Sequence, residues 1–240
     1  MSGHSKWSTI KRQKGAADQK RGVLFTKLSN AITVAVKQGG SGDPAANFRL
    51  RLAVDAAKTA NMPKDNIDRA IQKALGKGDE TVLEKVYEGF GPGGFSVIVE
   101  AVTNNTNRTS SEIKGIFEKN GGSFGSPGAV AYQFESKGEI IVDKTVSLDE
   151  LFMLAAESGA EDVKDTEDGL VVYTSVENLH PVQEALKNAT MPIQEAAVVR
   201  IPIVNFELAD DAAKERAVAF MGLLEEHPDV SGLYANAVLA

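Results

Sequence analysis

The 240-residue sequence contains no cysteine, and this absence excludes disulfide bonds, thiolate nucleophiles and cysteine-ligated zinc or iron–sulfur centres. No apolar run approaches the roughly 18–20 residues that a membrane-spanning helix needs, and no secretory signal pattern begins the sequence. The three histidines, His4, His180 and His227, belong to different expected elements and are not at metal-ligand spacing. We therefore expect a cytoplasmic protein that holds no metal and no cofactor.

Motifs of the common catalytic families are also missing. The sequence has no G-x-S-x-G, H-E-x-x-H or G-x-x-x-x-G-K-[ST] pattern. The acid pairs Asp210–Asp211 and Glu225–Glu226 lie at helix ends, where adjacent side chains point apart and suit solvation better than acid–base chemistry. Gly89–Gly94 fits G-x-G-x-x-G, but it precedes a strand rather than a helix, and Pro92 removes a backbone N–H. We interpret it as a turn and expect that the protein is not an enzyme.

What the sequence does have is a separation of charge along its length. Residues 1–77 hold 15 Lys or Arg against 5 Asp or Glu, a charge of +10. Residues 78–240 hold 11 against 28, a charge of −17, so the whole chain carries −7. A segment this basic attracts polyanions, whereas the acidic remainder repels them. We expect nucleic acid to bind at one end of the molecule. A merely soluble helical bundle is the alternative, although bundles usually mix the two signs over their surface.

Residues 1–17 contain Gly, Ser and Lys without apolar periodicity, which indicates an exposed arm. The expected nucleic-acid contacts of this arm are its four cations and its tryptophan, namely Lys6, Trp7, Lys11, Arg12 and Lys14. The tryptophan can stack on an unpaired base or pin the arm to the helical core, and the sequence leaves both open. Mitochondrial transit peptides share this composition, but Gly3, Trp7 and Gly15 interrupt the amphipathic helix that they require.

Three helices are expected after the arm, at Asp18–Lys37, about Asn47–Ala60 and Pro63–Gly76, because apolar residues recur there at three- and four-residue spacing. Several cations lie off their buried faces: Lys20, Arg21 and Lys27 on the first helix, and Arg69 and Lys73 on the third. The turn at Asn61–Pro63 gives the last two helices a weak similarity to a helix-turn-helix. Base-reading Asn and Gln are scarce on the exposed face, so we expect mainly phosphate contacts.

The rest of the chain alternates strand and helix patterns. From Glu139 to Ile201 the order is strand, helix, strand, strand, helix, strand, which is typical of a ferredoxin-like fold. A strand–helix–strand set precedes it, with strands at 95–102 and 129–134 and a helix opened by the capping box Thr109–Glu112. Another set follows it, with a helix at 209–226 and a strand at 232–238.

This order predicts an α+β multidomain protein, in which a three-helix N-terminal domain is joined to two ferredoxin-like α/β domains, one inserted in the other. Pro202 is expected to break the strand that the two α/β domains share. The expected boundaries are 1–78 for the basic helical domain, 79–136 with 203–240 for the acidic outer domain, and 137–202 for the inserted domain.

Several motifs, in the same order, resemble the YebC family: Gly3-His-Ser-Lys-Trp7, Lys20-Arg-Gly22 with Phe25-Thr-Lys27, Asn61-Met-Pro63, and Tyr87 to Gly94. The resemblance covers essentially the whole chain and implies a helical domain beside two α/β domains. It also implies a bacterial cytosolic protein, or the related mitochondrial translational activator of cytochrome oxidase subunit I. The basic positions of the family are matched by Lys6, Lys11, Lys20, Arg21, Lys27, Arg49 and Arg69.

The resemblance leaves two functions open. Family members are described as DNA-binding transcriptional regulators, including PmpR-type repressors of quorum-sensing genes. Others resemble translation factors that act at the ribosome, including at proline-rich stalls, and would contact ribosomal RNA or tRNA. We place DNA-linked regulation first, while the arm with Trp7 and acidic domains able to face ribosomal proteins favour translation. No dimerisation element is evident, so a monomer is expected.

Overall fold

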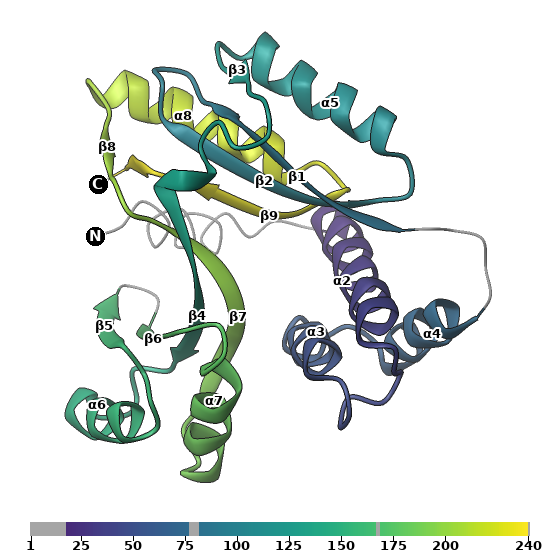
Figure 1. Ribbon diagram of the computed structural model, residues 1–240, viewed down its shortest axis with the longest axis vertical. Coiled ribbons are helices and arrows are strands. Elements are labelled where there is room, and N and C mark those ends of the chain that lie inside the picture. Colours follow the sequence, from purple (N-terminus) through teal and green to yellow (C-terminus); the bar gives the residue numbers. More distant parts are fainter. Residues whose placement is uncertain (1–17, 77–81, 167–168, 240) are drawn as a thin grey trace.

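The computed structural model describes residues 18–76, 82–166 and 169–239. Its first three helices are α2 (Asp18–Gly39), α3 (Phe48–Thr59) and α4 (Lys64–Leu75), on the right of Figure 1. The Asn47 side chain caps α3 by accepting the Leu50 N–H, and Asn61 supplies the positive φ of 57° in the turn before α4. The expected helix bounds are confirmed to within two residues. The helices share a core formed by Ile32, Val36, Leu50, Val54, Met62 and Ile67.

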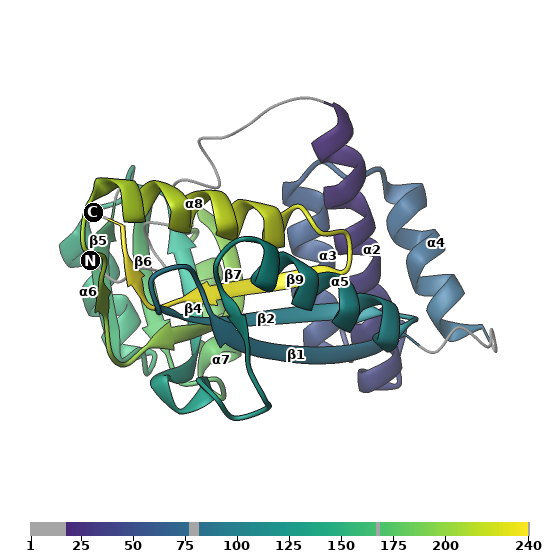
Figure 2. The same ribbon diagram turned by 90° about the horizontal axis from the view of Figure 1, so that it is seen from above.

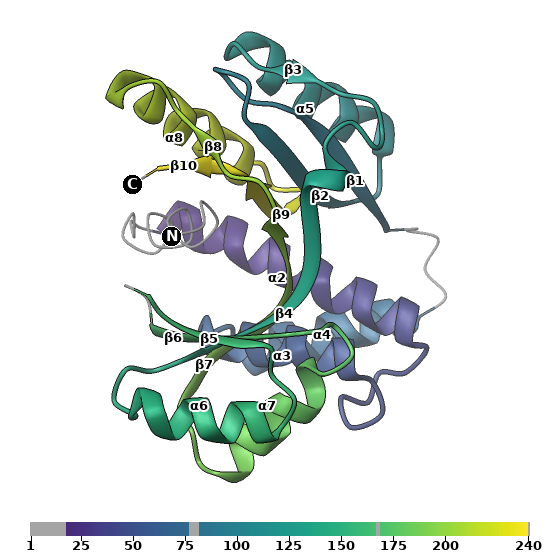
Figure 3. The ribbon, with the colours of Figure 1, turned by 60° about the vertical axis from the view of Figure 1, so that its left-hand side comes forward.

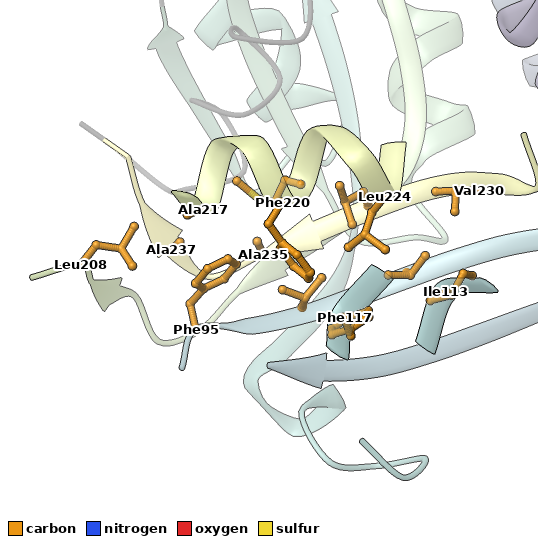
Figure 4. Packing of buried hydrophobic residues seen from close by; sticks show 14 of the residues in the cluster. Phe95, Ile113, Phe117, Leu208, Ala217, Phe220, Leu224, Val230, Ala235 and Ala237 are labelled. Atoms are coloured by element: carbon orange, nitrogen blue, oxygen red, sulfur yellow. The ribbon is translucent and has the colours of Figure 1, made fainter. Parts of the chain in front are cut away.

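A four-stranded sheet with the order β3-β1-β2-β9 forms the upper part of Figure 1. Its strands are β1 (Leu83–Phe90), β2 (Ser96–Thr103), β3 (Ser123–Phe124) and β9 (Val230–Ala235). Helices α5 (Thr106–Lys119) and α8 (Asp211–Glu225) cover one face, as Figure 2 shows. Between them lie Phe117 and Phe220, whose rings meet edge to face at 5.1 Å, labelled in Figure 4. A short parallel pair, β8 (Phe206–Glu207) and β10 (Ala237–Val238), lies beside this sheet.

A second four-stranded sheet has the order β5-β6-β4-β7. Its strands are β4 (Phe134–Val142), β5 (Asp162–Thr166), β6 (Gly169–Thr174) and β7 (Ile193–Pro202), and α6 (Leu148–Glu157) and α7 (Leu179–Asn188) cover one face. With the helices interleaved this is the expected β-α-β-β-α-β unit, and all its strand pairs are antiparallel. The ladder between β4 and β7 runs from Phe134 opposite Pro202 to Val142 opposite Ile193. The predicted α+β fold class is confirmed.

Three segments of the first sheet differ from the sequence prediction. No strand was predicted before 95–102, but β1 pairs along its whole length with β2, and Gly91 to Phe95 form the turn between them. The helix predicted to open at Thr109 begins one turn earlier with Asn105 as its cap, and the buried Thr109 lies inside it. The strand predicted at 129–134 is a loop with the short 3₁₀ helix η1 (Ala131–Gln133). The buried Glu88 carboxylate accepts three backbone N–H groups of this loop.

The helical domain contacts both sheets. α2 lies beside β2 and β9, and α3 lies beside β7. Phe48 and Leu52 of α3 join the core beneath α7, and the Phe48 ring lies 4.8 Å from the His180 ring. An ion pair from Lys187 to Asp55, 3.4 Å long, lies at the edge of the same contact. Figure 3 shows α2 between the two sheets and α3 beside the second one. Within the described ranges, no helix is long and apolar enough to cross a membrane.

Candidate nucleic-acid interface

The predicted contacts of the arm, Lys6, Trp7, Lys11, Arg12 and Lys14, lie outside the described residues. Lys20 and Arg21 belong to the first turn of α2. These seven positions therefore stay predictions from the sequence. The described part of the interface begins after the first turn of α2 and includes α3 and α4.

Three of the predicted cations are exposed on α3 and α4. Arg69 and Lys73 are one turn apart on the outer face of α4, opposite the buried Ile67 and Ala70. Arg69 also donates to Asn66 Oδ1 at 3.3 Å. Arg49 lies on α3, where its guanidinium donates to Gln38 Oε1 near the end of α2. The structure thus brings Arg69 and Lys73 together and places Arg49 on another helix.

Lys27 points toward the outer domain. Its ammonium group donates to the backbone carbonyl of Glu225, at the end of α8, where the helix dipole favours a cation. Arg51, which was not predicted, also faces inward: it donates to the carbonyls of Pro44 and Ala45 and lies 3.8 Å from Glu184. These two cations hold the helical domain against the acidic part of the chain. A role for Lys27 in nucleic-acid contact stays a prediction.

Lys58 and Lys64 are exposed cations that the sequence analysis missed. They flank the turn between α3 and α4 and, with Gln72 and Asp68, line the edges of a groove. The floor of the groove is apolar and consists of Val54, Met62, Ile67 and Ile71. Lys58 lies in the last turn of α3 and Lys64 in the first turn of α4. These positions could have indicated exposed cations from the sequence, because residues beside a tight interhelical turn are rarely covered.

The exposed surface of the helical domain keeps a positive excess. Among residues 22–76 six cations are exposed, namely Lys37, Arg49, Lys58, Lys64, Arg69 and Lys73. Three acids are exposed, namely Asp43, Asp65 and Asp68. Cations spread over neighbouring helices suit a phosphate backbone, whose charges are also spaced at intervals. The arrangement can therefore position a polyanion, and it offers few groups that distinguish one base from another.

A separate cluster brings His227 close to Glu112 and Asp229, although the sequence placed the histidines far from any ligand spacing. His227 Nδ1 accepts the Asp229 N–H, so Nε2 carries the proton and donates to Glu112 at 3.0 Å. Burial acts to raise the pKa of Asp229, but the Thr109 hydroxyl and the Arg108 guanidinium outweigh it and hold this pKa below its usual value. The cluster is a network that ties α5 to the turn before β9, and both ring nitrogens are occupied.

Comparison with known proteins covers almost the whole chain. Residues 5–77 match the family model described as "TACO1/YebC protein N-terminal domain", and residues 82–237 match "TACO1/YebC second and third domain". A protein of Desulfitobacterium hafniense named "Probable transcriptional regulatory protein" is 45% identical over 240 residues, covering 98% of this chain and 95% of that protein. A protein of the same name from Trichlorobacter lovleyi is 49% identical over 237 residues, with the same coverage.

The fold is also similar to a solved structure. The crystal structure of a conserved hypothetical protein from Aquifex aeolicus aligns with a TM-score of 0.86 at 43% sequence identity. The alignment covers 92% of this chain and 91% of that one. Both the three-helix domain and the two sheets therefore have a counterpart of known structure.

Proposed function

Because this chain belongs to the TACO1/YebC family, we propose that it is a non-enzymatic regulator of gene expression that binds nucleic acid through its basic helical domain. One observation carries the proposal. The cations of this domain that face inward, Lys27 and Arg51, contact the acidic domains, while six others are exposed on the outside. These exposed cations attract a polyanion, whereas the acidic sheets repel it. The names of the relatives, as transcriptional regulatory proteins, support the regulatory role.

Duplex DNA is the first target that we propose, since the relatives are named for transcription. Ribosomal RNA or tRNA is the second, and the composition of α4 supports it equally. The exposed side chains of α4 are mainly charged, with Gln72 as the one exposed amide on that helix. Contacts to phosphates fix the position of a nucleic acid but carry no sequence information, so they suit both targets. We further propose that the protein acts in the cytoplasm, as a monomer and without a cofactor.

The salt dependence of binding tests the electrostatic mechanism. If about six cations meet phosphates, log K should fall with log salt at a slope near −5 on duplex DNA and near −4 on single-stranded RNA. The double variant K58Q/K64Q should lower the magnitude of that slope by about 2. The matched control K114Q/K119Q removes two cations from α5 and should leave the slope unchanged. Equal slopes for wild type and K58Q/K64Q would remove the groove from the mechanism.

A second measurement tests the arm and the target. Changing Lys11, Arg12 and Lys14 to Glu should abolish binding without unfolding the protein, because the arm lacks the apolar periodicity of a core element. Gradient sedimentation of cell lysate with and without RNase then separates the two targets. RNase-sensitive migration with ribosomes selects ribosomal RNA, and RNase-resistant retention on DNA selects transcription. Loss of both associations would refute the proposal.

A further inference from the structure

Helix α6 exposes three large apolar side chains. Leu148, Phe152 and Met153 are 41%, 51% and 62% exposed, whereas Leu151 and Ala155 of the same helix are fully buried. At about 100° per residue, the three exposed side chains follow one flank of the helix, from the edge of its buried face to its solvent side. Large apolar side chains exposed near one another on a soluble protein, here with an aromatic ring and a methionine among them, are typical of a contact with another molecule.

Neighbouring α7 shows that covering this sheet does not require exposed apolar residues. α7 lies on the same face of the second sheet, and its exposed positions are Pro181, Lys187 and Asn188. In Figure 1 α6 lies on the far side of α7 from α2, α3 and α4. α7 therefore separates α6 from the basic helices, and the three apolar side chains of α6 stay exposed in the described part of the chain.

The charges around α6 are acidic and unpaired. Asp149 lies between Phe152 and Met153 around the helix, while Glu150 and Glu157 border the apolar surface on its far side. None of these three carboxylates forms an ion pair within the described part of the chain. The inserted domain has five cations, and each already forms an ion pair with an acid: Lys137, Lys144, Lys164, Lys187 and Arg200. A negative potential thus surrounds an apolar surface.

We propose that α6 is the docking surface for a protein helix that carries Lys or Arg beside its apolar residues. Leu148 and Phe152 form an i, i+4 ridge of the kind that packs into the groove of another helix, and cations of the partner would face the three acids. Nucleic acid and anionic lipid are repelled by the same acids, and pairing of α6 with the α6 of a second copy would bring like charges together. This surface is separate from the basic helices, so one molecule can bind a nucleic acid and a basic protein at once.

The test uses the full chain and two synthetic helical peptides of about 18 residues. Both peptides carry leucines along one face; the basic peptide has Lys on the other positions and the acidic peptide has Glu. Affinity is measured by fluorescence anisotropy, and the site is mapped from amide chemical shifts. The basic peptide should bind with shifts concentrated in residues 145–160, and the acidic peptide should not bind.

Variants then separate the apolar and charged contributions. F152Q/M153Q should weaken the basic peptide roughly tenfold or more, because truncated apolar anchors dominate interface losses. L223Q, the same kind of change at a 44% exposed leucine of α8, should stay within about twofold. D149N/E150Q should weaken binding and flatten its dependence on salt. All the altered side chains are exposed, so each variant should keep the wild-type melting temperature within a few degrees.

Several results would overturn the proposal. These are equal affinity of the basic peptide for wild type and F152Q/M153Q, equal binding of the acidic peptide, or an equal loss in L223Q. A concentration-dependent dimer, or binding to phosphatidylcholine vesicles, that F152Q/M153Q abolishes would assign the surface to a second copy or to a bilayer instead. Nucleic-acid affinity should be the same in F152Q/M153Q as in wild type, so failure here is distinct from failure of the proposed function.

Discussion

Replacing Glu88 with alanine should release the loop at 125–133 from strand β1, to which the Glu88 carboxylate holds it. The Glu88 carboxylate is 6% exposed and accepts the N–H groups of Gly128, Val130 and Ala131 at 2.7, 2.8 and 2.8 Å. The alanine variant leaves three donors without an acceptor, and the Val130 donor is the most deeply buried of them. An unsatisfied buried donor costs about 1–3 kcal/mol and one that reaches water costs less, so we expect a loss of about 3–5 kcal/mol.

The pKa of Glu88 gives this prediction a pH dependence. Burial acts to raise the pKa, but the three backbone donors and the positive charge of Arg200 outweigh it, so the pKa lies below its ordinary value of 4.5. A carboxyl group with a lowered pKa stabilises the folded state fully above its unfolded pKa, and this contribution is lost as the pH falls through the folded pKa. Wild type should therefore lose stability below pH 4.5, and E88Q should lack that part of the loss.

Hydrogen exchange of the loop is the direct assay. In the alanine variant the amides of Gly128, Val130 and Ala131 should exchange much faster, while the amides of α6 and α7 keep their protection. Urea unfolding followed by circular dichroism gives the free energy. E84A is the matched control, since Glu84 is exposed on the same strand and its carboxylate accepts the Gln38 amide. Unchanged exchange at 125–133, or a loss below about 1 kcal/mol, would refute the reasoning.

Two further substitutions test buried polar groups. Gln183 is 2% exposed, and its Oε1 has no hydrogen-bond partner among the described residues. Gln183→Met should therefore be neutral or stabilise the fold by about 1 kcal/mol, measured as a higher melting temperature, and a drop of several degrees would contradict this. The Thr109 hydroxyl is buried and donates to Asp229 at 2.6 Å, so Thr109→Val should cost about 2 kcal/mol in urea unfolding. A Thr109→Ser variant should retain most of that stability, and equal losses for the two variants would assign the effect to packing.

The inserted domain was predictable because its signals are local. The helices and strands from Glu139 to Ile201 follow the predicted order, and the run Leu170–Thr174 is almost entirely β-branched or aromatic. The outer domain was less predictable because distant contacts decide its structure. The loop at 129–134 has strand-forming residues, yet the Glu88 carboxylate takes up its backbone donors. The first four residues of β1 are all exposed, so the strand lacks the alternation of apolar and polar residues that would have predicted it from the sequence.

The same limit applies to the candidate interface. Periodicity correctly placed Arg69 and Lys73 on the outer face of α4, because helical spacing alone determines that face. It could not show that Lys27 meets the end of α8, since that contact joins residues almost two hundred positions apart. It also missed Lys58 and Lys64, whose shared groove exists only once α3 and α4 are packed.

The paired strands β4 and β7 link the two sheets. The chain passes between the sheets along both strands, and their hydrogen bonds make one antiparallel ribbon that continues to Phe134 and Pro202. Because two bonded strands cannot turn about single bonds as a lone linker can, we expect any relative motion of the sheets to be a bending of this ribbon. The three-helix domain should restrict this bending, because α2 contacts the first sheet and α3 contacts the second. Loss of the contact between Phe48 and His180 should release the second sheet from α3, while the paired strands β4 and β7 still prevent it from rotating freely.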